Sequence, residues 1–548
     1  MIDLLQCQKP QRYIGNEWNV IKKDHKNKIK ICLSYPDMYE IGMSNLGIRI
    51  IYGLLNESPD VACERVFMPG VDLINLLITN KQRLFSLETK TPLSDFEIIG
   101  FQLSQELNFI NFLSILDLGG IPLRSTERKE IIVIGGGINN PEPIAEFVDV
   151  FLLGEFEAVA KTFIDILIKY KKKEDRLKAF AEKDGFYVPK FYSVTILGNR
   201  YCFEKTYMQA KLPIKRVCVK DLDSAYYPTK WLVPHTQIIH DRAQIEISRG
   251  CPNFCSFCQA RSTYFPYRER KIERINEIIR EVYKNSGYGE MTFLSLSVSD
   301  YSEIKKLIDV NFNFFKENSI GLSLPSLRID DIFSSLYEKI LSLKKIPLTV
   351  ALEAVNDPLR QKLNKKIDPA KLFEVARKIR TQGIKHLKIY FMFGLPGEKE
   401  EDLTAIGRFL DALSIDSRLS LVASINPFMP KPFSFWENAS MEEESTLNNK
   451  RNVILKGNAN KRYIKLSMPS IQRSILEAVI SRADRNFSSV IYRVYTYIKK
   501  SNQYSECFSW EIWKEAMDRE KINHRFYIEN NLDNHPWSFI KLTKDASN

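Results

Sequence analysis

The chain has 548 residues, 44% hydrophobic and 27% charged, and its 79 Lys and Arg against 67 Asp and Glu give a net charge of +12. This composition excludes a disordered chain, and the length predicts two to four domains. No apolar run is long enough to cross a bilayer, and MIDLLQCQKP is not a basic-then-apolar leader. We therefore expect a cytoplasmic protein with no membrane partner. The positive charge would suit a nucleic acid, but the lysines are spread throughout the chain, which favours ordinary solvated side chains.

Short apolar runs alternate with helix-like segments in the first part of the chain. The runs are KICLSYP, CERVFMP, FEIIGFQLS, EIIVIGGG and VDVFLLGE. Strands that are apolar along their whole length, with helices between them, indicate a parallel sheet covered on both faces. We predict an N-terminal doubly wound α/β domain over 30–170, preceded by an extension (1–29) and followed by a connector (171–235) that contains a hairpin.

The alternation resumes at residue 236 with six candidate strands and amphipathic helices between them. The strand segments are QIEISRG, EMTFLSLSVSD, IGLSLPSL, LTVALEA, HLKIYFMFG and LSLVASINPF. Six successive strand–helix units predict a partial (β/α)6 TIM-type barrel over 236–440, with its chemistry at the carboxyl ends of the strands. Residues 441–548 are predicted to form a small, mostly helical C-terminal domain.

Three of the nine cysteines, Cys251, Cys255 and Cys258, are clustered in SRGCPNFCSFCQA, on the loop that leaves the first barrel strand. The other six are scattered, which excludes a secreted disulfide framework. Zinc commonly takes four ligands from paired hooks, and no second hook exists here. Three thiolates can instead hold three irons of a [4Fe-4S] cluster and leave the fourth iron open to a substrate or cofactor. The remaining alternative is three structural thiols that share this spacing by chance.

The CxxxCxxC spacing after the first strand of such a barrel resembles the radical S-adenosylmethionine superfamily. The resemblance implies that S-adenosylmethionine binds the open iron. It also implies that one electron from the cluster cleaves this cofactor to methionine and a 5′-deoxyadenosyl radical. An electron donor such as flavodoxin or ferredoxin is implied as a partner. Phe257, just before the third cysteine, matches the aromatic residue that lies beside the adenine in that superfamily.

Other barrel segments resemble further motifs of the same superfamily. FMFGLPGE is similar to the fifth-strand motif, which implies Gly394 and Pro396 as adenosine contacts, and LEAV resembles the fourth-strand motif, which implies Glu353. The alternatives are a Glu353 that pairs with a barrel Arg or Lys and a GLPG segment that is only a turn. The second-strand GGE motif is absent, and LSLSVSDY stands in its place. The candidates for the cofactor's amino group there are Ser297, Ser299 and Asp300.

The first domain resembles the cobalamin-binding domain that precedes the barrel in one subclass of the superfamily. SYPDMYEIGMSNLGIRIIYGLL, IVIGGG and FLLGEFE match its first strand and turn, its fourth-strand glycines and its closing segment. The resemblance implies cobalamin as a cofactor, with Gly135 and Gly136 as contacts, because glycine permits close backbone approach. The Asp-x-His-x-x-Gly signature is missing, and His25 is the only histidine before residue 235. A sheet domain without the cofactor is therefore the alternative.

Over nearly its whole length the chain is similar to an uncharacterised family of radical S-adenosylmethionine proteins with an N-terminal cobalamin-binding-like domain. The segments that carry this similarity include HDRAQIEISRGCPNFCSFCQARSTYFPYRER, PFMPKPFSFW, EAVISRADR and HPWSFI. Charged residues within them are candidate substrate contacts, with surface or inter-domain salt bridges as the favoured interpretation. These residues are Arg268, Arg270, Arg482, Asp484 and Arg485.

The leading hypothesis is a radical enzyme that modifies a substrate, RNA or protein among the candidates, at an unactivated carbon, with cobalamin-dependent methylation as its specific form. One alternative is a methylthiotransferase acting on RNA or a ribosomal protein, since PFMPKP resembles the end of that barrel too. Such an enzyme needs a second cluster from three N-terminal cysteines, whereas Cys32 and Cys63 fall on or beside predicted buried strands. The other alternative is a non-catalytic RNA-binding or assembly factor with a structural cluster, which the charge and the aromatic residues would suit.

Overall fold

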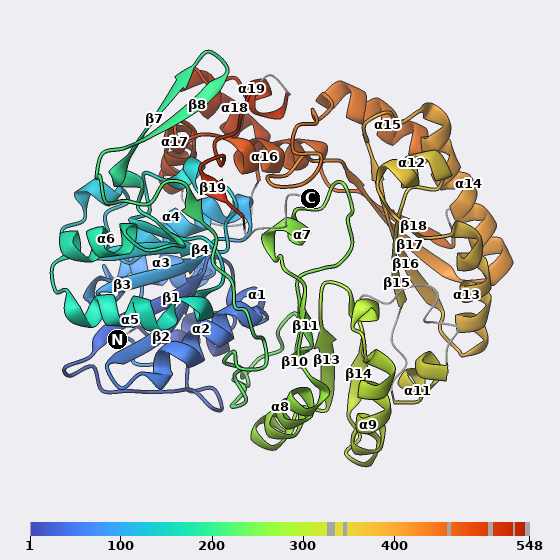
Figure 1. Ribbon diagram of the computed structural model, residues 1–548, viewed down its shortest axis with the longest axis horizontal. Helices are drawn as coiled ribbons and strands as arrows, with labels where there is room; N and C mark the ends of the chain where they lie inside the picture. The colour runs from blue at the N-terminus through green and yellow to red at the C-terminus, as the bar shows by residue number, and fades with distance from the viewer. Residues whose placement is uncertain are drawn as a thin grey trace.

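The computed structural model describes residues 2–325, 335–343, 348–457, 462–501, 508–529 and 532–542. An N-terminal sheet domain, a central barrel and a helical C-terminal region surround a common centre (Figure 1). Within the described ranges, no helix combines the length and apolar character needed to span a membrane. Cys507 and the last two residues of the third predicted barrel strand lie outside these ranges.

The N-terminal domain is a six-stranded sheet in the order β2-β1-β3-β4-β5-β6. Neighbouring strands are parallel except β6, which pairs with β5 in the opposite direction. This is the doubly wound architecture that the sequence predicts, and such sheets bind ligands where the strand order reverses, at the carboxyl ends of β1 and β3. The strands are β1 (Ile29–Tyr35), β2 (Val61–Phe67), β3 (Ile98–Gln102), β4 (Ile132–Gly136), β5 (Val150–Leu152) and β6 (Phe186–Tyr187).

Helices cover both faces of this sheet, which explains why a strand such as β2 is buried along its whole length (Figure 1). The side chain of Asn45 caps α2 by accepting a hydrogen bond from the Ile48 amide. The helices are α1 (Tyr39–Gly42), α2 (Leu46–Glu57), α3 (Val71–Thr79), α4 (Phe109–Leu118), α5 (Ala160–Lys169) and α6 (Lys173–Ala181). The connector then forms the expected antiparallel hairpin from β7 (Tyr192–Leu197) and β8 (Arg200–Lys205). Its short strand β9 (Ile214–Lys215) pairs with β19 (Ile540–Lys541) near the end of the chain.

The barrel strands form two parallel sheets in the described part of the chain, β10-β13-β14 and β15-β16-β17-β18. All six predicted strand segments contribute, and β18 adds a seventh parallel strand from the Lys- and Asn-rich segment. Its four residues are too few to show a recognisable strand period in the sequence. The strands are β10 (Ala243–Glu246), β13 (Glu290–Leu294), β14 (Gly321–Ser323), β15 (Leu348–Glu353), β16 (His386–Phe393), β17 (Ser420–Pro427) and β18 (Ile464–Ser467).

Helices lie outside the barrel sheets and bury one face of each strand (Figure 1). Along β16 and β17, buried residues alternate with half-buried ones, so one face of these strands is partly exposed. The helices here are α8 (Ile272–Ser286), α9 (Ile304–Glu317), α11 (Ser335–Leu343), α12 (Asp357–Lys362), α13 (Pro369–Thr381) and α14 (Glu400–Ser417). The C-terminal region contributes α15 (Glu444–Lys456), α16 (Ile471–Arg482), α17 (Phe487–Lys500), α18 (Trp510–Arg519) and α19 (Arg525–Ile528).

Candidate functional site

The three clustered cysteines lie on a closed loop at the carboxyl end of the first barrel strand. The loop leaves β11 (Ser248–Arg249), ends at α7 (Gln259–Thr263), and is closed by β12 (Arg268–Glu269), which pairs with β11. Gly250 has a φ of +90°, and a Cβ there would lie 2.7 Å from the Tyr264 carbonyl oxygen. Only glycine therefore allows the returning chain to pack against the start of the loop.

The thiols of Cys251, Cys255 and Cys258 are unpaired with one another, partly buried, and close enough to influence each other electrostatically. Burial raises the pKa of both Cys255 and Cys258. For Cys258, backbone N–H groups that hydrogen bond its sulfur lower the pKa and partly offset this rise. Within the described ranges, no His, Cys, Asp and Glu side chains converge on a single metal ion. In a cubane cluster each thiolate binds a different iron, so its sulfurs need not converge on one point. The donor set fits a [4Fe-4S] cluster and not a lone zinc ion.

The segment that follows β13 is tied directly to the cysteine loop. The Asn253 amide donates to Cys251 Sγ at 3.5 Å and to Asp300 Oδ2 at 2.6 Å. The hydroxyls of Ser248 and Ser295 are 2.7 Å apart, and the Ser297 amide donates to the Ser295 hydroxyl. The structure thus brings the three candidates of this segment beside the loop, with Asp300 already accepting from Asn253. Those candidates are Ser297, Ser299 and Asp300.

Glu353 ends β15 in an unusual backbone conformation. Its φ is +67°, next to an irregularity in the β15–β16 register, and such strain in a non-glycine residue tends to occur at functional sites. Burial raises the pKa of Glu353, while Lys365, whose Nζ lies 3.6 Å from Glu353 Oε1, opposes that shift. Both side chains also influence the pKa of Cys255, so the pair borders the cysteine loop. The lysine partner foreseen as an alternative for Glu353 is therefore part of the same site.

Phe257 joins the cysteine loop to the ends of the second barrel sheet. Its ring packs against a small apolar cluster at the carboxyl ends of β15, β16 and β17. The GLPG segment lies here as a turn, in which the Gly394 amide donates to Glu398 Oε2 at 2.8 Å and Pro396 is half-buried. The cluster consists of Ala354, Leu359, Leu363, Leu395 and Phe428. Phe257 and Gly394 thus reach the same barrel edge as the cysteines, although each also has a structural role.

In the N-terminal domain, Gly135 and Gly136 end β4 beside an apolar cavity of about 60 Å³ between the sheet and helices α2 and α5. A Cβ on Gly135 would lie 2.8 Å from Leu103 Cδ1, so a larger residue there would require the Leu103 side chain to shift. His25 precedes β1, at the opposite edge of the sheet, and its Nε2 lies 2.6 Å from Glu64 Oε1. His25 therefore cannot act as a cobalt ligand at the carboxyl edge.

Charged side chains join that carboxyl edge to the strands that flank the cysteine loop. Glu155, just after β5, accepts hydrogen bonds from both terminal nitrogens of Arg268, at 2.7 and 2.9 Å. Arg249, the second residue before Cys251, lies 3.1 Å from Glu155 and 2.9 Å from Glu157. Burial raises the pKa of Glu155, but the two guanidinium groups outweigh it and hold the pKa below its usual range. We call these four residues the junction network.

Polar side chains make a second connection between the same two domains. The Asn139 amide group, in the loop after β4, donates to Gln259 Oε1 at 3.0 Å, and Asn139 Oδ1 accepts from the Thr263 hydroxyl at 3.0 Å. Gln259 and Thr263 are the first and last residues of α7, which begins directly after Cys258. The loop after β4 therefore rests against the end of the cysteine loop.

The other charged candidates all make contacts within the protein, as ion pairs for Arg270 and Arg485 and as hydrogen bonds to neutral groups for Arg482 and Asp484. Arg270 pairs with Glu246, and Arg485 pairs with Glu142 of the N-terminal domain at 3.1 Å. Asp484 accepts hydrogen bonds from two tyrosine hydroxyls, and Arg482 donates to the carbonyl oxygens of Tyr527 and Glu437. Arg482, Asp484 and Arg485 thus hold the C-terminal region in place, whereas the pair of Arg270 and Glu246 lies within the barrel region.

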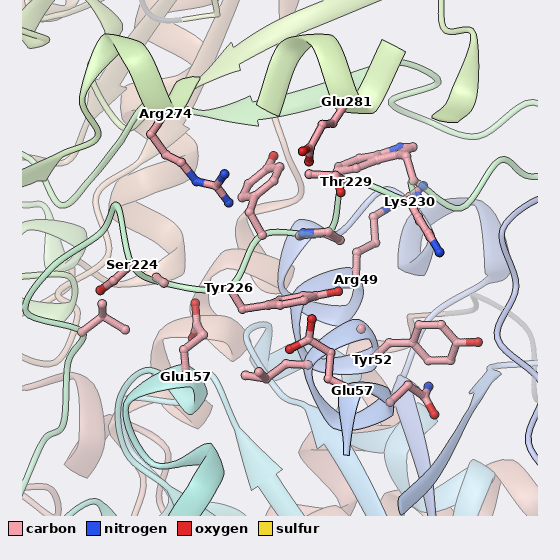
Figure 2. A pocket seen from close by; sticks show the side chains of 18 of the residues that line it. Arg49, Tyr52, Glu57, Glu157, Ser224, Tyr226, Thr229, Lys230, Arg274 and Glu281 are labelled. Carbon is pink, nitrogen blue, oxygen red and sulfur yellow. The ribbon is translucent and has the colours of Figure 1, made fainter. Parts of the chain in front are cut away.

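A larger cavity of about 1100 Å³ lies between α2, α8 and the connector (Figure 2). Arg274 and Glu281 reach toward it from α8, and Glu57 reaches toward it from α2. Acidic and basic side chains line it in similar number, so its charge does not single out a ligand. Glu157, a member of the junction network, also lines this cavity.

Sequence reasoning missed Asn253, Lys365, Asn139 and Gln259. Asn253 and Gln259 lie inside or directly beside the cysteine motif, so their position offered a usable signal. Lys365 and Asn139 are brought to the site only by the fold, because Lys365 follows Glu353 by a helix and a turn, and Asn139 belongs to the other domain.

Comparisons with known proteins agree with this geometry. The family described as radical SAM proteins, N-terminal, matches residues 47–189, and the radical SAM superfamily matches residues 245–410. An uncharacterised protein of Methanocaldococcus jannaschii is 27% identical over 467 residues, which cover 84% of this chain and 90% of that protein.

Two proteins of named activity also match. The ribosomal protein uS12 methylthiotransferase RimO of Desulfotalea psychrophila is 28% identical over 216 residues, 37% of this chain and 48% of that enzyme. The solved structure of TsrM from Kitasatospora setae is a radical S-adenosylmethionine methyltransferase with cobalamin and a [4Fe-4S] cluster bound. It matches with a TM-score of 0.55 at 11% identity, over 90% of this chain and 99% of that one. At this identity the match shows a shared fold.

Proposed function

The chain belongs to the radical S-adenosylmethionine superfamily and is an enzyme of that superfamily, and from this premise we propose that it methylates an unactivated carbon with the help of cobalamin. The observation that carries the proposal is the direct contact between the carboxyl edge of the N-terminal sheet and the cysteine loop. Asn139 bonded to Gln259 and Glu155 bonded to Arg268 make that contact. Methyl transfer needs two cofactors with their reactive atoms held near each other, and this arrangement supports it.

On the barrel side, Cys251, Cys255 and Cys258 would hold the [4Fe-4S] cluster. When bound, the cluster supplies one electron for the reductive cleavage of S-adenosylmethionine. Glu353 and Lys365 present a carboxylate and an ammonium group beside the loop, which complement the charges of the amino-acid end of S-adenosylmethionine. The remaining contacts assigned to this cofactor are Phe257, Ser297, Ser299, Gly394 and Pro396.

On the sheet side, Gly135 and Gly136 line an apolar slot that suits the buried tail of a cobalamin. The slot holds about 60 Å³, so α2 or α5 must shift outward when the tail enters. Because His25 lies at the opposite edge and is bonded to Glu64, it would not bind the cobalt of a cobalamin held at this site. A sheet domain without cobalamin is the alternative, and a substrate would then dock there.

Methylthiotransfer is a second candidate, favoured by the similarity to RimO. A second cluster would need N-terminal thiolates, and Cys32 and Cys63 are 0% and 1% exposed within β1 and β2. Burial raises the pKa of both thiols well above the usual value, which disfavours the thiolate form that binds iron. Iron analysis after anaerobic reconstitution separates the two functions, because one cubane gives about four irons per chain and two give about eight.

The test of the proposal uses S-adenosylmethionine with a deuterated methyl group. The reconstituted, cobalamin-loaded protein is incubated with RNA, protein and metabolite fractions from a deletion strain, and mass spectrometry locates the label. Label on a carbon atom of one fraction supports the proposal. Cofactor cleavage without cobalamin uptake and without any labelled product contradicts it, and a protein that cleaves no S-adenosylmethionine would be a structural-cluster protein instead.

A further inference from the structure

We propose that the surface around Phe254 and Phe435 is the docking site of a small acidic protein that carries one electron and reduces the cluster. This inference rests on the proposed function, because only a redox-active cluster needs such a partner. Each reductive cleavage consumes one electron, which must be replaced from outside the chain. Electron transfer weakens steeply with distance, so the carrier has to bind where the cysteine loop reaches the surface.

Phe254 lies between the first two clustered cysteines and is 45% exposed, whereas the other residues from Cys251 to Cys258 are half-buried. The Arg261 guanidinium carbon stacks 3.5 Å from the centre of its ring. Phe435, which is 52% exposed, has its ring centre 5.2 Å from the same guanidinium carbon. Two exposed rings that contact one arginine, one of them within the metal-binding loop, form a small contact surface. We call these three residues the aromatic patch.

Lysines border the aromatic patch on one side. The segment 362–366 runs along the cysteine loop, where the Ser256 amide donates to the Leu363 carbonyl oxygen at 3.1 Å and the Asn364 side chain donates to the Phe254 carbonyl oxygen at 3.0 Å. Lys362 and Lys366, at the two ends of this segment, are exposed. The outward-facing charge of the segment is therefore positive.

The acidic residues next to this segment are engaged locally and do not cancel that charge. Asp357 pairs with Arg360 on the same helical turn, and Asp368 caps α13 by accepting from the Ala370 amide at 2.9 Å. Glu437 accepts from the Phe433 amide and from the Trp537 indole. The stretch 357–368 holds four basic and two acidic side chains, so a partner that approaches the aromatic patch meets a net positive charge.

Aromatic side chains at the centre and charges at the rim are the usual anatomy of a protein interface. Redox encounters use small contact areas, for which two rings and a short basic segment are sufficient. Rim charges mainly set the association rate and its salt dependence, so positive lysines favour an acidic carrier. In the transfer itself the carrier loses one electron and the cluster held by the three cysteines gains it. No atom or proton passes between the two proteins.

The experiment compares two electron sources in the variant K362E/K366E. Formation of 5′-deoxyadenosine is measured anaerobically with flavodoxin that is kept reduced by NADPH and flavodoxin reductase, and separately with dithionite. We expect the flavodoxin concentration for half-maximal rate to rise about tenfold at low ionic strength. The difference should shrink as salt screens the charges. The dithionite-driven rate should not change. The matched control is K161E/K171E, which reverses two exposed lysines on the N-terminal domain and should behave as the parent.

Parent-like use of flavodoxin by K362E/K366E would overturn the proposal. Reduced ferredoxin is run in parallel, and a parent protein that accepts electrons from dithionite but from neither carrier would overturn it as well. Calorimetry measures flavodoxin binding without turnover, so it distinguishes failure of the docking site from failure of the proposed function. If dithionite drives no cleavage in the parent, the proposed function fails, while binding lost in the variant supports the docking site and binding retained overturns it. Loss of total-RNA binding with unchanged flavodoxin binding would assign the surface to a nucleic acid and also overturn the proposal.

Discussion

The cysteine loop is held in different ways on its two sides. Toward the N-terminal domain it is fixed by the junction network and by Asn139, through charged and polar hydrogen bonds of defined direction. Toward the second barrel sheet it is fixed by backbone hydrogen bonds of Ser256 and by the apolar packing of Phe257. Directional bonds specify how two domains are oriented, whereas apolar packing tolerates small displacements. The first side therefore suits the alignment of two cofactors. The second suits a binding surface into which one cofactor must enter.

The largest effect should come from replacing the cysteines of the loop, because without the cluster neither side of the loop has a cofactor to position. Replacing Cys251, Cys255 or Cys258 by Ala should abolish conversion of S-adenosylmethionine to 5′-deoxyadenosine in the reconstituted protein, because the cluster loses a thiolate ligand. Cys202→Ala, on the connector hairpin, is the control and should retain the parent rate. Unchanged turnover in any one of the three loop variants would refute the metal-site assignment.

Breaking the charged side should uncouple the two domains while leaving the cluster in place. In Glu155→Gln, the buried guanidinium of Arg268 loses its carboxylate partner, whereas Arg249 keeps Glu157 and Glu246. Removing one partner of a buried ion pair costs about 3–5 kcal/mol. We expect methyl transfer to fall by at least about tenfold relative to 5′-deoxyadenosine formation. The measurement is the ratio of the two products. Glu174→Gln, which removes an exposed pair with Lys190, is the control.

The junction should also weaken in acid. The pKa of Glu155 is lower in the folded protein than in the unfolded chain, so its ionised form stabilises the junction fully above the ordinary glutamate pKa. That stabilisation is lost as the pH falls through the lower, folded-state value. A product ratio that stays constant from neutral pH down to the acid limit of folding would argue against the junction network as the coupling element.

On the apolar side, Glu353→Gln should weaken S-adenosylmethionine binding by about tenfold, since one charged hydrogen bond is lost. Equilibrium binding to the reconstituted cluster is the readout, and Glu374→Gln on α13 is a remote control. If Glu353 only closes a structural pair with Lys365, the variant will lose thermal stability while its affinity for S-adenosylmethionine stays the same.

Phe257→Ala should have a smaller effect on the same equilibrium, a loss of about 1–2 kcal/mol, on the scale of one aromatic contact. Phe257→Leu is the matched variant, because it keeps apolar volume and loses the ring. Loss of the cluster with unchanged cofactor affinity would identify Phe257 as a packing residue of the loop.

The smallest effect concerns cobalamin. We predict stoichiometric uptake, with a visible spectrum that His25→Ala leaves unchanged, because His25 is bonded to Glu64 at the far edge of the sheet. A spectral change in this variant would mean that the N-terminal segment rearranges when cobalamin binds. A protein that takes up no cobalamin, yet cleaves S-adenosylmethionine, would leave the first domain as a substrate-docking module.

The sequence predicted most strands because short, mainly apolar runs between helix-like segments mark them, a local pattern that can be recognised without knowledge of tertiary contacts. It also located the cysteine loop, since the spacing of the three thiols is a local property. It could not pair Lys365 with Glu353, because that contact depends on how the turn after α12 folds back. Nor could it find Asn139 or the partners of Glu155, which belong to a contact between domains. Residue spacing can be recognised in a sequence, whereas contacts between domains depend on the fold.

The pairing of β9 with β19 has a consequence for how the protein is made. It joins Ile214 to Ile540, so this closure must wait until the last strand has left the ribosome. The Trp537 indole also holds Glu437, in the loop whose Trp436 amide donates to the carbonyl oxygen of Ser256. During synthesis the cysteine loop therefore emerges long before the segment that secures its cover. In this interval the cysteine loop lacks the contacts that Trp436 and Trp537 complete in the folded chain.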